Sequence, residues 1–259
     1  LRIPDPAARP GEPANFSKLR LSAPGAVRRP SLDAEPRSIH DLAYELIRVL
    51  DDDGNAVGPW VPELSSAMLI SNLRTMMLTR VFDERMYRAQ RQGKCSFYVR
   101  STGEEAVSAA QAAALESTDM MFGSYRSQGL LIARGYPVIK MMGQVYSNVL
   151  DPLLGRQMPV MYSSREHNYF TISGNLGTQF IQAVGWAMGS ALSGDTRIAA
   201  SWIGDGTTAE GDFHYALTFA SVYRAPVILN VVNNQWAISS FQGIAGGDEA
   251  PFAARGIGY

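Results

Sequence analysis

The alternation of strand-like and helix-like segments between residues 197 and 232 constrains the fold more than any other feature of this chain. Residues 197–203 and 227–232 are short apolar runs typical of buried strands, and residues 208–223 between them are predicted to form a helix. A strand, a helix and a second strand in this order form a βαβ unit, in which the strands are parallel and the crossover is right-handed. We therefore predict an α/β fold built on a parallel, doubly wound sheet.

The periodicity of apolar residues predicts several helices ahead of this unit. The longest covers residues 63–92, and Gly93 follows it as a C-terminal stop. The shorter predicted helices cover residues 103–115, 127–134, 137–148 and 178–192. Gly and Ala are frequent in the last of these, which predicts close packing against a helix or a sheet.

Only two core strands are predicted before the sequence reaches Tyr259. A doubly wound sheet normally contains more strands than two. We therefore expect the α/β domain, predicted to cover residues 62–259, to be incomplete at its C-terminal end or to be completed by a partner.

The N-terminal part of the chain has the composition of an extended arm. Half of the 14 prolines lie in the first 36 residues, and they alternate with Arg2, Arg9, Arg20, Arg28 and Arg29. Such a segment does not build a core, and both a flexible tail and a strap on a partner subunit fit it. We predict an arm over residues 1–37 and, around the turn residues 51–55, a peripheral hairpin over residues 38–61.

Charge and cysteine content limit the partners and the compartment. Lys and Arg number 23 against 24 Asp and Glu, so no bulk field draws the chain toward nucleic acid or an anionic membrane. A single cysteine, Cys95, rules out an internal disulfide. No apolar run approaches the ~20 residues that span a bilayer, and no secretory signal begins the sequence. We expect a cytoplasmic protein that binds neither nucleic acid nor membrane.

Polar residues follow both strands of the βαβ unit. Gly204, Asp205 and Gly206 end the first strand, and Asn233 and Asn234 end the second. The carboxyl ends of parallel strands meet at one edge of the sheet, where open α/β sheets bind ligands. Glycines and a helix N-terminus suit a phosphate there, and carboxylate and amide oxygens suit Mg²⁺. Without such a ligand, Asp205 would be an ordinary helix cap.

Residues 204–209 also match the G-x-G-x-x-A variant of the dinucleotide fingerprint, which makes a nicotinamide-binding oxidoreductase a rival hypothesis. That function expects an acidic residue near the end of the second strand, but this strand ends in Val232, Asn233 and Asn234, with no Asp or Glu among them. In addition, the carboxylate of Asp205 would repel a pyrophosphate. A divalent cation between the two groups removes this repulsion, which favours a metal–diphosphate site.

The pairing of Gly204–Gly206 with Asn233–Asn234 across a helix resembles the motif that binds thiamine diphosphate. Four further segments, residues 122–126, 155–159, 171–179 and 209–212, are similar to the α subunits of branched-chain 2-oxo acid (2-oxoisovalerate) dehydrogenases. The resemblance implies the thiamine diphosphate-binding fold. It also implies decarboxylation of a 2-oxo acid and acyl transfer to the lipoyl arm of a dihydrolipoyl acyltransferase core. The partner it implies is a β subunit, in an α2β2 heterotetramer.

The same resemblance assigns roles to individual residues. The Mg²⁺ ligands it implies are Asp205, Asn234 and the carbonyl of Trp236. The cofactor contacts it implies are Tyr125 and Arg126 at the diphosphate, Gly206 and Thr207 beside it, and Leu176 and Ile238 at the thiamine rings, with Ser173 and Gly174 in the same set. Ser173, Thr178 and Gln179 match a loop that binds K⁺ in relatives. The catalytic residues stay unassigned, with His167 as a supporting candidate.

Several points depart from the family pattern or stay open. Relatives often carry Arg where this chain has Val232, and some carry Pro in place of Asn175. The family's catalytic His-bearing loop would fall after Tyr259. Pyruvate or acetoin are alternative substrates, a non-catalytic scaffold is a further alternative function, and the mitochondrial matrix is an alternative compartment.

Overall fold

The computed structural model describes residues 3–9, 11–13, 15 and 21–259. Residues 1–2, 10, 14 and 16–20 of the predicted arm, among them Arg2, Pro10 and Arg20, lie outside these ranges. Contacts divide the chain into two compact units. The sheet unit contains residues 65–203 and 210–230, and the terminal unit contains residues up to 64 together with 204–209 and 231–259. The predicted segments 1–37 and 38–61 both fall in the terminal unit, and the predicted segment 62–259 is divided between the two units. The three predicted segments stay a prediction.

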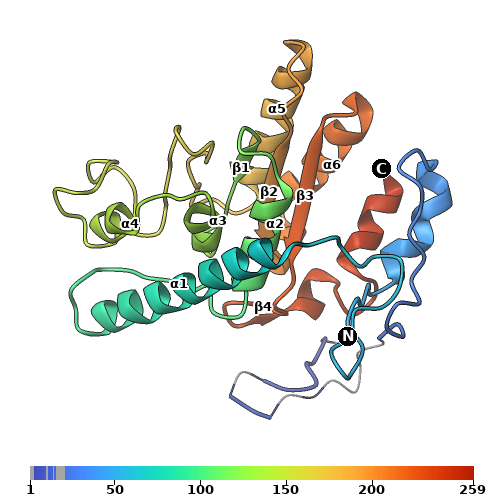
Figure 1. Cartoon of the computed structure of the whole chain (residues 1–259), viewed down its shortest axis with the longest axis horizontal. Coiled ribbons are helices and arrows are strands. Elements are labelled where there is room, and N and C mark those ends of the chain that lie inside the picture. The colour runs from blue at the N-terminus through green and yellow to red at the C-terminus, as the bar shows by residue number, and fades with distance from the viewer. Residues whose placement is uncertain (1–2, 10, 14, 16–20) are drawn as a thin grey trace. The chain divides into compact units, whose positions relative to one another are not determined.

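The core of the fold is a parallel three-stranded sheet, in which β2 lies between β1 and β3 (Figure 1). The strands are β1 (Met120–Phe122), β2 (Ala199–Gly204) and β3 (Val227–Val232). Strand β2 is buried along almost its whole length, as is typical of a parallel strand covered on both faces. The predicted α/β organisation and both predicted strands are confirmed. Strand β1 was not predicted, because three apolar residues show no periodicity.

The helices of the sheet unit follow the predicted pattern. Helix α1 (Ser66–Arg91) begins where the Ser65 hydroxyl accepts a hydrogen bond from the Met68 amide at 3.2 Å, and Gly93 follows it with φ of 70°. The others are α2 (Glu105–Ala114), α3 (Gln128–Ala133), α4 (Val138–Val145), α5 (Thr178–Leu192) and α6 (Gly211–Tyr223). Helix α5 packs Ala183 and Ala187 against Phe122 and Ala199, which accounts for its small residues.

The helix predicted over residues 208–223 begins later than expected. A separate 3₁₀ turn, η2 (Asp205–Ala209), precedes α6, whose N-cap position is Glu210. The Thr208 hydroxyl donates to the Asp205 carbonyl at 2.7 Å and closes this turn. Asp205 is therefore not the N-cap of α6, and its side chain is available for another role.

The described residues of the terminal unit form short elements. Besides η2, these are η1 (Pro36–Tyr44), β4 (Trp236–Ala237), β5 (Ser240–Phe241), η3 (Gln242–Ala245) and η4 (Phe252–Gly258). Where a hairpin was expected over residues 38–61, the structure has η1 and a single antiparallel bridge between Leu50 and Ala56. Pro36, at the start of η1, favours the helical turn over a paired strand, because proline fixes φ and has no N–H group to donate to a sheet. The exposed ion pair of Arg28 with Asp41, at 2.6 Å, adds a contact to this turn.

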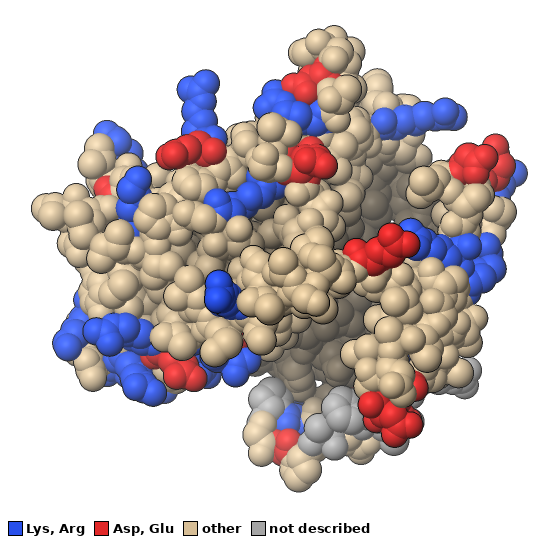
Figure 2. Space-filling view, in the orientation of Figure 1, with Lys and Arg blue, Asp and Glu red and all other residues tan. Residues whose placement is uncertain are grey.

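The surface agrees with the near-zero net charge. On the face that Figure 2 shows, acidic and basic side chains are interspersed, with wide uncharged areas between them. Within the described ranges, no helix has the length and apolar content needed to cross a membrane.

A partly buried polar bridge ties α2 to the sheet. The Trp202 indole donates to Gln111 Oε1, and Gln111 Nε2 donates to Asn230 Oδ1 at 2.9 Å. We expect Gln111→Ala to lower the free energy of unfolding by about 1 kcal/mol, because it removes the acceptor of the buried Trp202 indole and the donor to the half-buried Asn230 side chain. Urea denaturation followed by circular dichroism measures this. An unchanged midpoint would show that the bridge carries no net stability.

Candidate functional site

Asp205 is the most unusual polar group of the terminal unit. It directly follows β2, and only 1% of its surface is exposed. Burial raises the pKa of its carboxyl group, and backbone N–H groups, including those of Gly206 and Asn234, oppose this rise by donating to the carboxylate. Oxygen Oδ2 is fully buried and, among the described residues, has no hydrogen-bond partner.

A buried carboxylate oxygen without a donor costs free energy. Such an oxygen is also the preferred ligand of a hard cation such as Mg²⁺. The Asn234 amide that donates to Asp205 directly follows Asn233 at the end of β3, so the two strand ends meet as the spacing indicated. Asp205 Oδ2 therefore fits a cation ligand, and nothing in the described protein takes that place.

The segment after Asn234 brings further oxygen atoms to the same loop. Asn234 Oδ1 accepts a hydrogen bond from the Trp236 amide at 3.1 Å, which folds the Asn side chain over the start of β4. Trp236 pairs with Phe241 in the β4–β5 hairpin, and their ring centroids lie 5.7 Å apart. At the tip of this hairpin Ile238 is 98% exposed, with φ of 57°. An apolar side chain in this position is available to a ligand.

Gly206 allows the loop after Asp205 to approach the hairpin closely. A Cβ atom at this position would overlap the Cβ of Ala237. Thr207 and Thr208 are buried beside it. Arg255 of η4 holds the same loop, donating to the Thr208 carbonyl at 2.8 Å and to the Ala245 carbonyl. Arg255 was not predicted as a residue of this site, because the sequence around it contains no recognisable motif.

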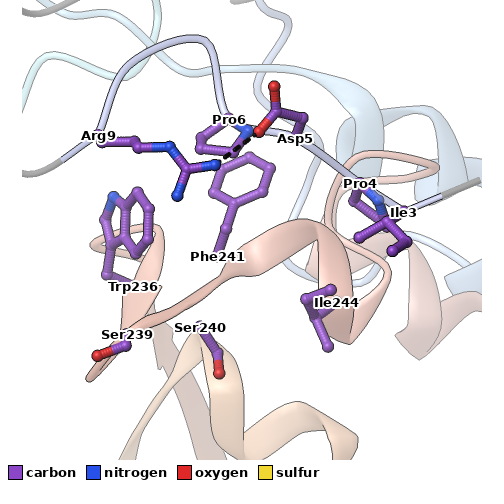
Figure 3. A pocket seen from close by; sticks show the side chains of 10 residues that line it. All are labelled: Ile3, Pro4, Asp5, Pro6, Arg9, Trp236, Ser239, Ser240, Phe241 and Ile244. Carbon is purple, nitrogen blue, oxygen red and sulfur yellow. Dashed lines mark hydrogen bonds and ion pairs between the residues drawn. The ribbon is translucent and has the colours of Figure 1, made fainter.

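A cavity of about 380 Å³ lies on the β4–β5 hairpin of the same unit (Figure 3). The N-terminal residues Ile3–Arg9 supply one wall, where Arg9 forms an ion pair with Asp5 at 3.0 Å. Figure 3 shows the Arg9 side chain above Trp236, the residue whose carbonyl is a predicted metal ligand. The described N-terminal residues therefore contact their own chain at this hairpin.

The predicted diphosphate contacts Tyr125 and Arg126 belong to the sheet unit. They lie on the loop after β1, and both are half-buried. The Arg126 guanidinium lies 5.6 Å from the centre of the Tyr125 ring and donates to the carbonyl of Arg100. No other hydrogen bond of this guanidinium is found in the described part of the chain, so its other N–H groups are available to an anion.

The predicted K⁺ loop lies at the start of α5 in the sheet unit. The Ser173 hydroxyl accepts from the Asn175 amide at 3.1 Å, and the Ser173 carbonyl accepts from Gln179 Nε2 at 3.3 Å. Gln179 is buried, and its Oε1 atom finds no partner in the described ranges. Thr178 is the first residue of α5, and Gly174 and Leu176 lie exposed on the loop. The structure thus brings Ser173 and Gln179 together.

His167, the supporting catalytic candidate, lies in the sheet unit among residues of its own loop. Its Nδ1 atom is 2.8 Å from the Ser164 hydroxyl, and its ring packs edge to face on Tyr136 with centroids 5.1 Å apart. Over the residues that the structure describes, no three His, Cys, Asp or Glu side chains gather as metal ligands. The predicted Mg²⁺ ligands would not form such a cluster, because they combine one carboxylate with a side-chain amide oxygen and a backbone carbonyl oxygen.

Comparison with known proteins gives two family matches. The family described as "Dehydrogenase E1 component" matches residues 73–259. The family described as "2-oxoisovalerate dehydrogenase E1 alpha subunit N terminal" matches residues 1–37.

Individual relatives carry names of the same kind. The 2-oxoisovalerate dehydrogenase subunit alpha of Pseudomonas aeruginosa is 62% identical over 258 residues, which cover 100% of this chain and 63% of that protein. The mouse mitochondrial 2-oxoisovalerate dehydrogenase subunit alpha is 40% identical over 83% of this chain and 48% of its own length. The Arabidopsis thaliana mitochondrial subunit alpha 1 is 42% identical over 74% of this chain and 41% of its own length. The chain therefore spans about half the length of these relatives.

Proposed function

The chain belongs to the dehydrogenase E1 component family, and we propose that it is the cofactor-binding part of the α subunit of a branched-chain 2-oxo acid dehydrogenase. The observation that carries this proposal is the buried Asp205 carboxylate, whose Oδ2 atom has no partner in the described protein. A Mg²⁺ ion bound with thiamine diphosphate would supply that partner. The names of the relatives support the substrate class.

The proposed metal ligands are Asp205 Oδ2, Asn234 Oδ1 and the carbonyl oxygen of Trp236. Asn234 Oδ1 accepts a hydrogen bond from the Trp236 amide, and an amide oxygen is a ligand type that Mg²⁺ accepts. When bound, thiamine diphosphate supplies the nucleophilic carbon and the electron sink that decarboxylation of a 2-oxo acid requires. The protein's part is to hold the metal and the diphosphate in place, so that the reactive carbon meets the substrate in one orientation.

The remaining assignments follow the family resemblance. We propose the doubly wound thiamine diphosphate-binding fold, with Tyr125 and Arg126 contacting the diphosphate. The further proposed contacts are Gly206 and Thr207 at the diphosphate, Leu176 and Ile238 at the thiamine rings, Ser173 and Gly174 nearby, and Ser173, Thr178 and Gln179 at a K⁺ ion. His167 stays a supporting candidate. Its contacts with Ser164 and Tyr136 equally fit a structural histidine.

The proposal includes partners. We infer a β subunit that completes an α2β2 enzyme and supplies the acid facing the aminopyrimidine ring, and a lipoyl-bearing acyltransferase core that accepts the acyl group. The substrate is a branched-chain 2-oxo acid, and the compartment is the cytoplasm. Turnover faster with 3-methyl-2-oxobutanoate than with pyruvate is the expected result. The reverse order would favour the pyruvate or acetoin alternative.

Calorimetric titration tests the cofactor assignment. The chain, assembled with its β subunit, is titrated with thiamine diphosphate in the presence of Mg²⁺ and again after removal of the metal by a chelator. We expect binding only with the metal. Tight binding of NADH without Mg²⁺ would favour the nicotinamide alternative, and the absence of any diphosphate binding would favour the scaffold.

Gly206→Ala tests the close approach beside Asp205. The added Cβ overlaps Ala237, so the β4–β5 hairpin must shift away from the loop that carries the proposed ligands. We expect the affinity for thiamine diphosphate with Mg²⁺ to fall about tenfold, as for an overpacked contact. Gly256→Ala is the matched control, because a Cβ there has open space around it. Unchanged affinity in Gly206→Ala would show that hairpin and loop move independently.

A further inference from the structure

Asp83 is a fully buried carboxylate that none of the assignments above uses. It lies on α1 and is 0% exposed. Its Oδ1 accepts from the Tyr98 hydroxyl at 2.6 Å, and its Oδ2 accepts from the Ser101 amide at 2.6 Å and the Ser101 hydroxyl at 2.9 Å. Burial raises the pKa of Asp83, and these donors counter the rise. An apolar residue would avoid the desolvation cost, so the carboxylate requires an explanation beyond packing.

The segment between these two donors is held at every residue. Tyr98 and Ser101 bind Asp83, and the Val99 carbonyl accepts from Gln128 Nε2 at 2.7 Å. The remaining carbonyl, that of Arg100, accepts from Arg126. We call residues 98–101 the clamped segment. Side chains from α1, from α3 and from the loop after β1 therefore fix four consecutive residues.

The Arg100 side chain adds a further hold on the clamped segment. Its guanidinium lies 4.2 Å from the centre of the Tyr87 ring, on the same helix as Asp83. A cation over an aromatic face at this distance is attracted to it. Helix α1 thus holds Arg100 through Tyr98 and Ser101, which bind Asp83, and through the contact of the Arg100 side chain with Tyr87.

We propose that Asp83 is a positioning residue for Arg126, which it aligns toward the cofactor diphosphate by fixing the Arg100 carbonyl. The inference rests on the proposed function, since it takes Arg126 as a diphosphate contact. A long arginine side chain loses rotamer freedom when it binds an anion. A carbonyl already held in place by Asp83 removes part of that loss before the ligand arrives, which is the general gain of preorganisation. Without the carboxylate the clamped segment loosens, and Arg126 must be ordered by the ligand.

The test is a double-mutant cycle on the α chain assembled with its β subunit. Asp83→Asn keeps the size of the side chain, and Arg126→Lys keeps the charge but changes the hydrogen bond to Arg100. The dissociation constant of thiamine diphosphate with Mg²⁺ is measured for the four combinations by calorimetry. In the wild-type background, we expect Asp83→Asn to weaken thiamine diphosphate binding roughly tenfold. In the Arg126→Lys background, we expect the same substitution to weaken it less than about twofold. For Asp83→Asn alone, kcat at saturating cofactor should stay within about twofold of wild type, since only binding of the cofactor is weakened.

Two further variants keep the test decisive. Tyr98→Phe removes one hydrogen bond to Asp83 and serves if Asp83→Asn does not fold; a loss of affinity of the same kind, smaller in size, is expected. Asp151→Asn is the matched control, because Asp151 is also buried and accepts backbone N–H groups, but it lies outside the clamped segment.

The outcomes separate the two proposals. The positioning role would be overturned if Asp83→Asn lowered the affinity equally in the wild-type and Arg126→Lys backgrounds, or if Asp151→Asn lowered it to a similar extent. Asp83 would then only contribute to packing. Failure of the wild-type assembly to bind thiamine diphosphate would overturn the proposed function, and the inference from it, before any variant is compared.

Discussion

Asp205→Ala is expected to abolish Mg²⁺-dependent binding of thiamine diphosphate. Losing an outer contact of a metal site costs about 10–100-fold in affinity, so losing a direct ligand should cost at least about 100-fold. The stability of the apo protein should change little, because removal of a buried carboxylate oxygen that has no partner among the described residues offsets the loss of the hydrogen bonds that the Gly206 and Asn234 amides donate. Calorimetric titration measures the affinity, and thermal unfolding without metal measures the stability.

The control for this substitution is Asp195→Asn. Asp195 precedes strand β2, which Asp205 follows. It pairs with Arg197 at 2.5 Å and is partly exposed, so its replacement should leave cofactor binding unchanged. Asp205→Ala that still binds with Mg²⁺, or that unfolds while Asp195→Asn does not, would assign Asp205 to the fold and not to the metal.

Gly123→Ala is expected to have the largest effect on stability. A Cβ atom at residue 123 would overlap the Tyr169 hydroxyl and lie 2.6 Å from Cζ of the same ring. Tyr169 is 1% exposed and cannot swing away. Overpacking of this severity should lower the free energy of unfolding by about 3 kcal/mol. Chemical denaturation measures the change.

Two companion variants identify the cause of that loss. Tyr169→Phe in the Gly123→Ala background removes the atom nearest to the new methyl group and should restore part of the stability. Gly256→Ala adds a methyl group in open space and should change stability by less than about 0.5 kcal/mol. Equal stability of Gly123→Ala and wild type would show that Tyr169 can rearrange.

The parts of the fold that the sequence predicted best are those with a repeated pattern. Strand β3 was predicted at the residues where it occurs, and α5 was predicted at both ends, because apolar runs and helical periodicity extend over many residues. Strand β1 was missed because it has three residues. The 3₁₀ turn η2 was missed because the Thr208 hydrogen bond that closes it depends on geometry that a pattern does not encode.

The candidate site, too, was predicted only in part from the sequence. The meeting of Asp205 with Asn234 followed from the rule that parallel strands end at one edge, and the Asn234 amide does donate to the carboxylate. Arg255 could not be predicted, because it reaches the loop after Asp205 from residues far along the chain. The same holds for the link from Asp83 to Arg100 and Arg126, which joins three separate elements through a backbone carbonyl.

The measurement that tests the central claim most directly is anomalous scattering from Mn²⁺, used in place of Mg²⁺, in crystals of the αβ assembly grown with thiamine diphosphate. The account predicts an anomalous peak about 2 Å from Asp205 Oδ2, also coordinated by the Asn234 side chain and the cofactor diphosphate. A diphosphate bound with its metal elsewhere, or a peak at which Asp205 takes no part, would contradict it.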